Sequence, residues 1–512
     1  MAAQSNYRTL LRGGTLLVHD DESHVQPTCA DLLIVGNTIA RIQKNILLEE
    51  EDAAKTTIID CRGKIICPGF ISTHHHLYQT PMKGQHANHT LLEYFPTGNF
   101  TASLYSLADA FWGELGGALE AIDAGTTTVV DHSSLNLSPE YPKTTLRALA
   151  SSGLRAIYAY CSPRIVQSWS PLKWTDDYSS DWVLDSFNSL AKDEPIASGR
   201  VRLGFAVDNL YLPAEEISAL YARIRSAGAK VITSHAVGGL SFGNPPSAVQ
   251  ILAQHGLLGP DILLSHANFP KDGDAELLRT AGAWVSSTPN TELQMGMPPV
   301  ALQAGFSSQA SLGVDCHSWG SGFIPGQMRL LLQWARCQRA EDLAAAGEWS
   351  RHVGFGVEEV FNLGTVGGAR AVGMSDEIGR IQEGFKADLV VFGTQSPGML
   401  VAAVESPVAA VVLHSNERDV EMVIVDGVVR KQEGHLIDVV TAPPVGGGPT
   451  GLGVEEGERI TWDDVAGEVL SSRERLKQKM LGIDWDAAEE VTLDRFHYNR
   501  KSMVEAVNSG DA

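Results

Sequence analysis

The chain has 512 residues, a length that favours two or three domains with sizeable hydrophobic cores. Its 61 Asp and Glu against 39 Lys and Arg give a formal net charge of -22. This argues against nucleic acid or an anionic membrane as a partner, because both require a basic surface. The six cysteines form no CxxC pair and no long apolar run occurs, so we expect a cytoplasmic protein with reduced thiols.

Both ends of the chain are predicted to form β-structure. Residues 7–66 contain short apolar runs separated by turn residues, and the same pattern occurs again in residues 365–440. We therefore expect residues 1–66 and 365–440 to be the two parts of one β-sandwich. Residues 441–512 begin with a Pro/Gly linker, TAPPVGGGPTGLG, and continue as a polar helical extension that we expect to serve packing or oligomer contacts.

The middle of the chain, residues 67–364, alternates apolar strand candidates with helical segments such as 213–228 and 247–256. Eight strand–helix units in this length predict a (β/α)8 barrel. A doubly wound open sheet would need a Gly-rich phosphate loop after its first strand, but the chain has STHHHLYQT at that point. The expected strands end near Thr73, His132, Tyr160, Val207, His235, His266, Ser287 and Asp315.

Three consecutive histidines follow the first barrel strand, in PGFISTHHHLYQT. Because strand side chains alternate between faces, His74 and His76 point one way and His75 points the other. The carboxyl ends of barrel strands meet at one mouth, so ionisable residues at those ends are expected to converge. A set of imidazoles with a carboxylate suits one divalent ion, Zn²⁺ or Fe²⁺. The candidates at strand ends are His74, His76, His235, His266 and Asp315.

The motifs around these strand ends occur in a specific order: PGFISTHHH, AGTTTVVDH, VITSHA, LLSHA, STPNTELQMG and SLGVD. As an ordered set they resemble the amidohydrolase superfamily. The flanking segments LLRGGTLLV and DEIGRIQEGFKADLVVF are similar to the small sheet domain of its cytosine deaminase and atrazine chlorohydrolase-like branch. The resemblance extends over roughly residues 8–437 and implies a (β/α)8 barrel, a composite β-sandwich and a single catalytic metal ion.

The resemblance also implies roles for individual residues. His74, His76, His235 and Asp315 resemble the family's metal ligands, and Asp315 would in addition accept a proton from the metal-bound water. His266 resembles the histidine that orients this water and stabilises developing negative charge. A divalent cation lowers the pKa of bound water toward about 7, which makes hydroxide available at neutral pH. The fifth strand carries no lysine that could bridge two metals, which favours a mononuclear site.

One position departs from the pattern of the family. Deaminases of this branch carry H-x-x-E after the fifth strand, and the glutamate protonates a ring nitrogen of the substrate. This chain has Gly238 at that position, in SHAVGG. A missing general acid typically costs about 10²- to 10⁴-fold in rate. Glu292, just past the seventh strand, and His317, beside Asp315, are the candidates to replace it.

Three interpretations of this departure stay open. In the first, another acid substitutes and the enzyme deaminates its substrate. In the second, the enzyme hydrolyses an amide, or an ester, lactone or halide, and Asp315 relays the proton. In the third, the site performs lyase chemistry or only binds metal and ligand. We expect foremost a metal-dependent hydrolase that cleaves a non-peptide carbon–nitrogen bond in a small cyclic, nitrogen-containing molecule, and a homo-oligomer, either dimer or tetramer.

Substrate contacts are expected from side chains near the predicted barrel mouth. Residues 85–112 form a long segment between the first strand and its helix, and such a segment can act as a lid. Further candidate substrate contacts come directly after the histidine ligands of the first strand, at the end of the second strand, and just after Asp315. The expected substrate-binding residues are Tyr78, Gln79, Trp112, His132 and His317.

Overall fold

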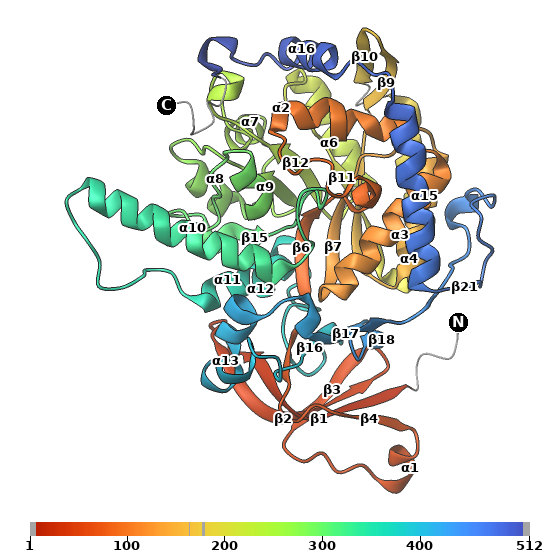
Figure 1. Ribbon diagram of the computed structural model, residues 1–512, viewed down its shortest axis with the longest axis vertical. Coiled ribbons are helices and arrows are strands. Elements are labelled where there is room, and N and C mark those ends of the chain that lie inside the picture. The colour runs from red at the N-terminus through yellow and green to blue at the C-terminus, as the bar shows by residue number, and fades with distance from the viewer. Residues whose placement is uncertain (1–6, 163, 177–179, 505–512) are drawn as a thin grey trace.

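The computed structural model describes residues 7–162, 164–176 and 180–504. Its centre is an eight-stranded parallel sheet surrounded by helices (Figure 1). The sheet closes between its first and last strands, because the His74 carbonyl accepts hydrogen bonds from the amides of Val314 and Asp315. The predicted (β/α)8 barrel is therefore confirmed. Its strands are β6 (Phe70–His75), β7 (Thr126–Ser133), β8 (Arg155–Cys161), β11 (Val201–Ala206), β12 (Ile232–Ala236), β13 (Ile262–His266), β14 (Trp284–Ser287) and β15 (Ala310–Leu312).

The barrel strands form where the sequence is almost continuously apolar or small, because both faces of such a strand are covered. Every residue of β7, β8 and β13 is buried. The expected strand ends agree with the structure at His266 and Ser287, whereas the last strand ends at Leu312, earlier than expected. One helix follows each strand: α3 (Leu107–Asp123), α4 (Glu140–Ser152), α5 (Asp181–Ala191), α6 (Ala214–Ser226), α7 (Ala248–Gln254), α8 (Asp274–Ala281), α9 (Pro289–Gln294) and α10 (Ile324–Ala345).

Both ends of the chain build a second sheet, below the barrel in Figure 1. The two ends meet where β5 (Ile65–Pro68) pairs antiparallel with β16 (Leu389–Phe392). The predicted sheet made from both chain ends is thus confirmed. Its other strands are β1 (Arg8–His19), β2 (Val25–Val35), β3 (Thr38–Gln43), β4 (Thr56–Asp60), β17 (Val420–Val425), β18 (Val428–Gln432) and β19 (His435–Leu436).

A buried ion-pair network holds this second sheet against the barrel. Arg155, at the start of β8, donates through Nε to Asp388 Oδ2 at 2.7 Å and through Nη2 to Asp426 Oδ1 at 2.9 Å. Arg155 and Asp388 are both buried. Removing one partner of such a pair leaves a buried charge uncompensated, which typically costs about 3–5 kcal/mol. The barrel and the end-built sheet therefore depend on each other.

The C-terminal part of the chain folds back over the barrel. Its helices and the neighbouring hairpin are α15 (Trp462–Met480), α16 (Trp485–Arg495), β9 (Arg164–Trp169) and β10 (Leu172–Asp176). α15 packs along α3, where Arg475 Nη2 pairs with buried Asp109 Oδ1 at 2.8 Å. α16 lies at the end of the barrel farthest from the second sheet, beside β10 (Figure 1).

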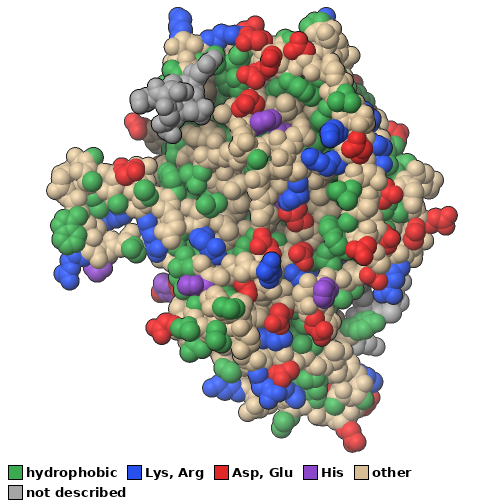
Figure 2. Space-filling view, viewed as in Figure 1, with side chains coloured by type: hydrophobic (Ala, Val, Ile, Leu, Met, Phe, Trp, Pro, Cys, Tyr) green, Lys and Arg blue, Asp and Glu red, His purple; other side chains and the backbone are tan. Residues whose placement is uncertain are grey.

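Figure 2 shows acidic, basic and apolar side chains interspersed over the face that Figure 1 displays. α10 projects to the left of the barrel, and Trp349, in the loop that follows it, is exposed. No helix within the described residues is long and apolar enough to cross a membrane. The remaining elements are α1 (Glu50–Ala53), α2 (Leu91–Tyr94), α11 (Val357–Leu363), α12 (Val366–Ala371), α13 (Leu400–Glu405), α14 (Pro407–Ala409), β20 (Val439–Val440) and β21 (Arg459–Ile460).

Candidate metal centre and active site

Four of the predicted metal ligands converge at the mouth of the barrel. His74 and His76 come from the end of β6, His235 from β12, and Asp315 follows β15. The Nε2 atoms of His76 and His235 lie 3.2 Å apart. Asp315 Oδ1 lies 3.1 Å from His74 Nε2 and 3.3 Å from His76 Nε2. The structure thus brings these four side chains to one point, as their places at strand ends predict.

The hydrogen bonds behind the imidazoles fix which ring nitrogen carries the proton. His76 Nδ1 lies 2.8 Å from the carbonyl oxygen of His132, and His235 Nδ1 lies 3.0 Å from Asp208 Oδ1. Both oxygens only accept, so each Nδ1 donates and each Nε2 presents a lone pair. His74 Nδ1 is held by Ser265 Oγ at 2.8 Å, which leaves its Nε2 facing Asp315 Oδ1.

This arrangement fits a bound divalent cation. Two lone pairs that face each other at 3.2 Å cannot form a hydrogen bond, and a carboxylate beside them adds further negative potential. A cation satisfies all of these atoms at once, whereas one water molecule has only two protons for three imidazole nitrogens and a carboxylate oxygen. Imidazole and carboxylate are donors that zinc commonly binds. The second ring nitrogen of each histidine is held by a hydrogen bond, as is usual in such sites. The three imidazoles and the carboxylate therefore suit a divalent cation such as zinc.

Asp208 is a site residue that the sequence reasoning missed. Its carboxylate bridges His132 Nε2 at 3.2 Å and His235 Nδ1 at 3.0 Å. Burial raises the pKa of Asp208, but the two imidazoles outweigh it and hold that pKa well below its usual range. The available signal was its position, because Asp208 follows the fourth barrel strand directly, just past the expected strand end at Val207.

His266 stands beside the four donors, at the end of β13. Its Nε2 lies 3.9 Å from Asp315 Oδ2, and its Nδ1 lies 3.0 Å from Thr288 Oγ1. Both His266 and Asp315 have positive φ angles, 73° and 66°, which non-glycine residues rarely adopt. Strain of this kind is concentrated at functional sites, where the surrounding structure maintains it. The backbone thus aims both side chains at the same point.

Glu292 lies behind His266 rather than in the open site. It belongs to α9, is fully buried, and places Oε1 3.5 Å from His266 Nδ1. Burial raises its pKa above the usual range for glutamate. Glu292 does not line the cavity above the donors, so its carboxyl group faces a histidine and not a substrate.

Five predicted substrate-binding residues lie outside the cavity lining. Each is buried and already engaged elsewhere. Trp112 packs in the core against Phe111, because it lies on the inner face of α3. The polar contacts are those of Gln79, whose Nε2 donates to the hydroxyls of Tyr78 and Tyr94, of His132, which contacts Asp208, and of His317, which lies 3.1 Å from Glu120 Oε2. His75 packs against His317 on the far side of the strand, as the alternation predicts.

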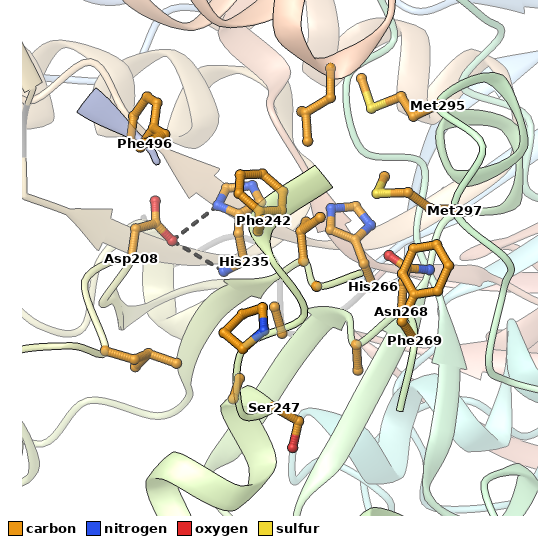
Figure 3. A pocket seen from close by; sticks show the side chains of 18 of the residues that line it. Asp208, His235, Phe242, Ser247, His266, Asn268, Phe269, Met295, Met297 and Phe496 are labelled. Carbon is orange, nitrogen blue, oxygen red and sulfur yellow. Dashed lines mark hydrogen bonds and ion pairs between the residues drawn. The ribbon is translucent and has the colours of Figure 1, made fainter. Parts of the chain in front are cut away.

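A cavity of about 550 Å³ opens above the donors (Figure 3). Its walls are mostly apolar, with Phe269, Met295 and Met297 labelled around His266 in Figure 3. Gly238, at the position of the family's glutamate, lines the same cavity. A Cβ atom at Gly238 would contact only the Asn268 carbonyl oxygen, at 3.4 Å, so the position is open and offers no acid.

Comparison with known proteins places the chain in a family. The model of the amidohydrolase family matches residues 65–240 and 252–430. The chain belongs to the amidohydrolase family. A 5-methylthioadenosine/S-adenosylhomocysteine deaminase of Acetivibrio thermocellus is 28% identical over 405 residues, which cover 76% of this chain and 88% of that protein. A 5′-deoxyadenosine deaminase of Methanothermobacter thermautotrophicus is 26% identical over 419 residues, 79% of this chain and 90% of that protein.

Solved structures share the fold. An atrazine chlorohydrolase from Arthrobacter aurescens, complexed with zinc, superposes with a TM-score of 0.68 at 21% identity and covers 91% of this chain and 100% of its own. An adenosine deaminase from Xanthomonas campestris with bound zinc gives a TM-score of 0.71 at 16% identity, with coverages of 93% and 99%. The predicted membership and the predicted class, a metal-dependent hydrolase, are confirmed. The family match ends at residue 430, so α15 and α16 lie beyond it.

Proposed function

We propose that this amidohydrolase removes the amino group of a small aminated nitrogen heterocycle by hydrolysis, using one zinc ion. The curated relatives are deaminases of adenosine derivatives, and both solved relatives named above carry zinc. The observation that carries the proposal is the convergence of three imidazole Nε2 atoms and Asp315 at the floor of an apolar cavity. Fe²⁺ would suit the same donors, and metal analysis of the purified protein separates the two.

The proposed ligands are His74, His76, His235 and Asp315. A divalent cation held there would lower the pKa of a water molecule and so supply the nucleophile near neutral pH. Asp315 Oδ2 faces His266 and is placed to accept the proton of that water and return it to the departing amine. His266 donates a hydrogen bond through Nε2 to the oxygen that develops negative charge.

We propose supporting roles for two more carboxylates. Asp208 keeps the Nδ1 proton on His235, which leaves Nε2 free to bind metal, and Glu292 holds the ring of His266. Glu292 does not line the cavity, whereas Asp208 lines it but is already paired with His132 and His235. Glu292 is therefore a positioning residue and not the replacement for the glutamate absent at position 238.

One observation favours a second candidate function. Gly238 leaves the cavity without an acid at the family's usual place, and His317 lies outside the cavity. Displacement of a halide, or hydrolysis of an ester or lactone, does not require protonation of a ring nitrogen before the attack. Asp315 would then transfer its proton to the leaving group or to solvent water.

The test is a product assay on the zinc-loaded protein, with Asp315→Asn as the blank. Aminated purines, pyrimidines and triazines are assayed for ammonia, and their chlorinated counterparts for chloride. Ammonia release above the blank supports deamination, and chloride release without ammonia supports the second candidate. Neither product from any ring, although one zinc ion is bound per chain, would overturn deamination and halide displacement.

A further inference from the structure

The segment after α16 reaches the active-site cavity, although it lies beyond the family match. Arg495, Phe496 and His497 all line the cavity that opens above the metal donors. Figure 3 shows Phe496 and Phe242 around the same cavity as His235 and His266. The C-terminal part of the chain therefore belongs to the site and not only to the outer surface.

Aromatic contacts fix the position of Phe496. Its ring stacks on Phe95 with centroids 4.8 Å apart and on Trp174 with centroids 5.9 Å apart. The guanidinium carbon of Arg164 lies 5.4 Å from the centre of the same ring. Aromatic pairs at such distances stabilise a contact beyond what their buried area contributes. Phe496 is thus held by the segment after β6 and by the β9–β10 hairpin.

A second attachment joins the C-terminal segment to the loop after β12. The Asn499 amide donates to the Ser241 carbonyl at 2.7 Å, and the rings of Tyr498 and Phe242 lie 4.7 Å apart. The same loop carries Gly238 and begins at the metal-site strand. The segment therefore spans the mouth from one wall to the other. We call the cavity-lining rings of Phe95, Phe242 and Phe496 the aromatic roof.

The carboxylates that line the cavity are engaged with the protein itself. Of the described residues that line it, three are carboxylates: Asp208 and Asp315 pair with histidines, and Asp274 accepts from Ser247 Oγ and from the Lys271 amide, both at 2.8 Å. A cationic substituent of a substrate would find no spare carboxylate there. An apolar substituent would find aromatic rings and thioethers, which are efficient partners for flat or flexible apolar groups.

We infer that the substrate carries an apolar, ring-sized substituent that lies against Phe496, a specificity-determining residue supplied by the C-terminal segment. The inference deepens the proposed function and rests on it for the identity of the aminated ring. The metal donors act on the ring, and the aromatic roof selects the group attached to it. Removing a well-packed apolar contact of this kind typically costs about tenfold or more in specificity.

The test compares matched probes on the full-length, zinc-loaded protein: adenine with 9-benzyladenine, and cytosine with 1-benzylcytosine. Where turnover occurs, kcat and KM are measured; otherwise binding is measured by isothermal titration calorimetry. We expect the wild type to favour the benzylated member of at least one pair by about tenfold or more, chiefly through KM. Phe496→Ala should remove most of that preference, because the benzyl group then loses its aromatic contact.

Two further variants make the result decisive. Phe496→Leu keeps an apolar contact and should retain part of the preference, while Leu470→Ala, an exposed position on α15, should change nothing. A wild type without preference, or an unchanged preference in Phe496→Ala, would overturn the inference. Preferential binding without turnover of any probe would leave the inference standing and count against the proposed function. Turnover without preference would support the proposed function and overturn the inference.

Discussion

The floor and the roof of the cavity are built by different kinds of structure. The floor consists of side chains at the ends of barrel strands, each held by a hydrogen bond on its far side, such as the one from His235 Nδ1 to Asp208. The roof consists of aromatic rings from segments distant in the sequence, held by stacking. Changes in the floor should therefore alter the chemistry, whereas changes in the roof should alter the choice of substrate.

The largest expected effect is that of Asp315→Asn in the floor. The amide keeps the shape of the side chain but removes the anionic oxygen that lies 3.1 Å from His74 Nε2. We expect a fall in kcat of about 10³-fold or more, because a metal ligand and a proton acceptor are lost together. The measurement is turnover per bound zinc, with circular dichroism to show that the barrel persists. Activity within tenfold of the wild type would remove Asp315 from the mechanism.

Asp208→Asn tests the anchoring of the floor. Loss of this carboxylate frees the Nδ1 proton of His235 to change position. We expect zinc affinity, measured by competition with a chelating dye, to fall by about 10- to 100-fold. The matched control is Asp185→Asn, an exposed position on α5, which should leave the affinity unchanged. Equal affinities in the two variants would show that the histidine needs no anchor.

Gly238→Glu tests the departure from the family's pattern. The position lines the cavity and has room for a Cβ atom. If ammonia is the product, an acid at this place should raise its release by about tenfold or more, because general acids contribute on the order of 10²- to 10⁴-fold. Gly238→Gln, of the same size but without an acid, should give no gain. Equal rates in both variants would mean that ring protonation does not limit the reaction.

Glu292→Gln separates a positioning role from an acid role. The amide can still contact His266 Nδ1, whose distance to Glu292 Oε1 is 3.5 Å. We expect kcat to fall by about tenfold while zinc affinity and KM stay the same. Glu292→Ala should cost more, because it also empties a fully buried site. If Gln were as damaging as Ala, the charge or the proton of Glu292, rather than its contact, would be required.

The smallest expected effect belongs to the roof's support. Trp485 packs on Trp169 with ring centroids 5.6 Å apart, away from the cavity lining. Trp485→Ala should weaken the docking of α16 by about 1 kcal/mol and raise KM for a substituted ring only about twofold. Limited proteolysis should then cut residues 481–499 sooner than in the wild type. Unchanged proteolysis would show that other contacts hold the segment.

The floor could be predicted from the sequence, because strand alternation and barrel topology together determine where His74, His76 and His235 must point. Asp208 was not predicted as a site residue because the fourth strand was expected to end one residue before it. Trp112 was assigned to the cavity because its segment was a lid candidate, but the face of a buried helix is decided by packing that local sequence does not reveal. Phe496 could not be foreseen, since its partner Phe95 is contributed by a remote part of the chain.

If three histidines and Asp315 hold one catalytic cation, turnover must follow the bound metal. The most direct measurement is to strip the purified protein with a chelator and titrate zinc back, following bound metal by elemental analysis and turnover on the same samples. We predict that turnover is lost on stripping and returns in proportion to zinc, with an end point at one ion per chain. Full activity in the stripped protein, or an end point at two ions, would contradict the account.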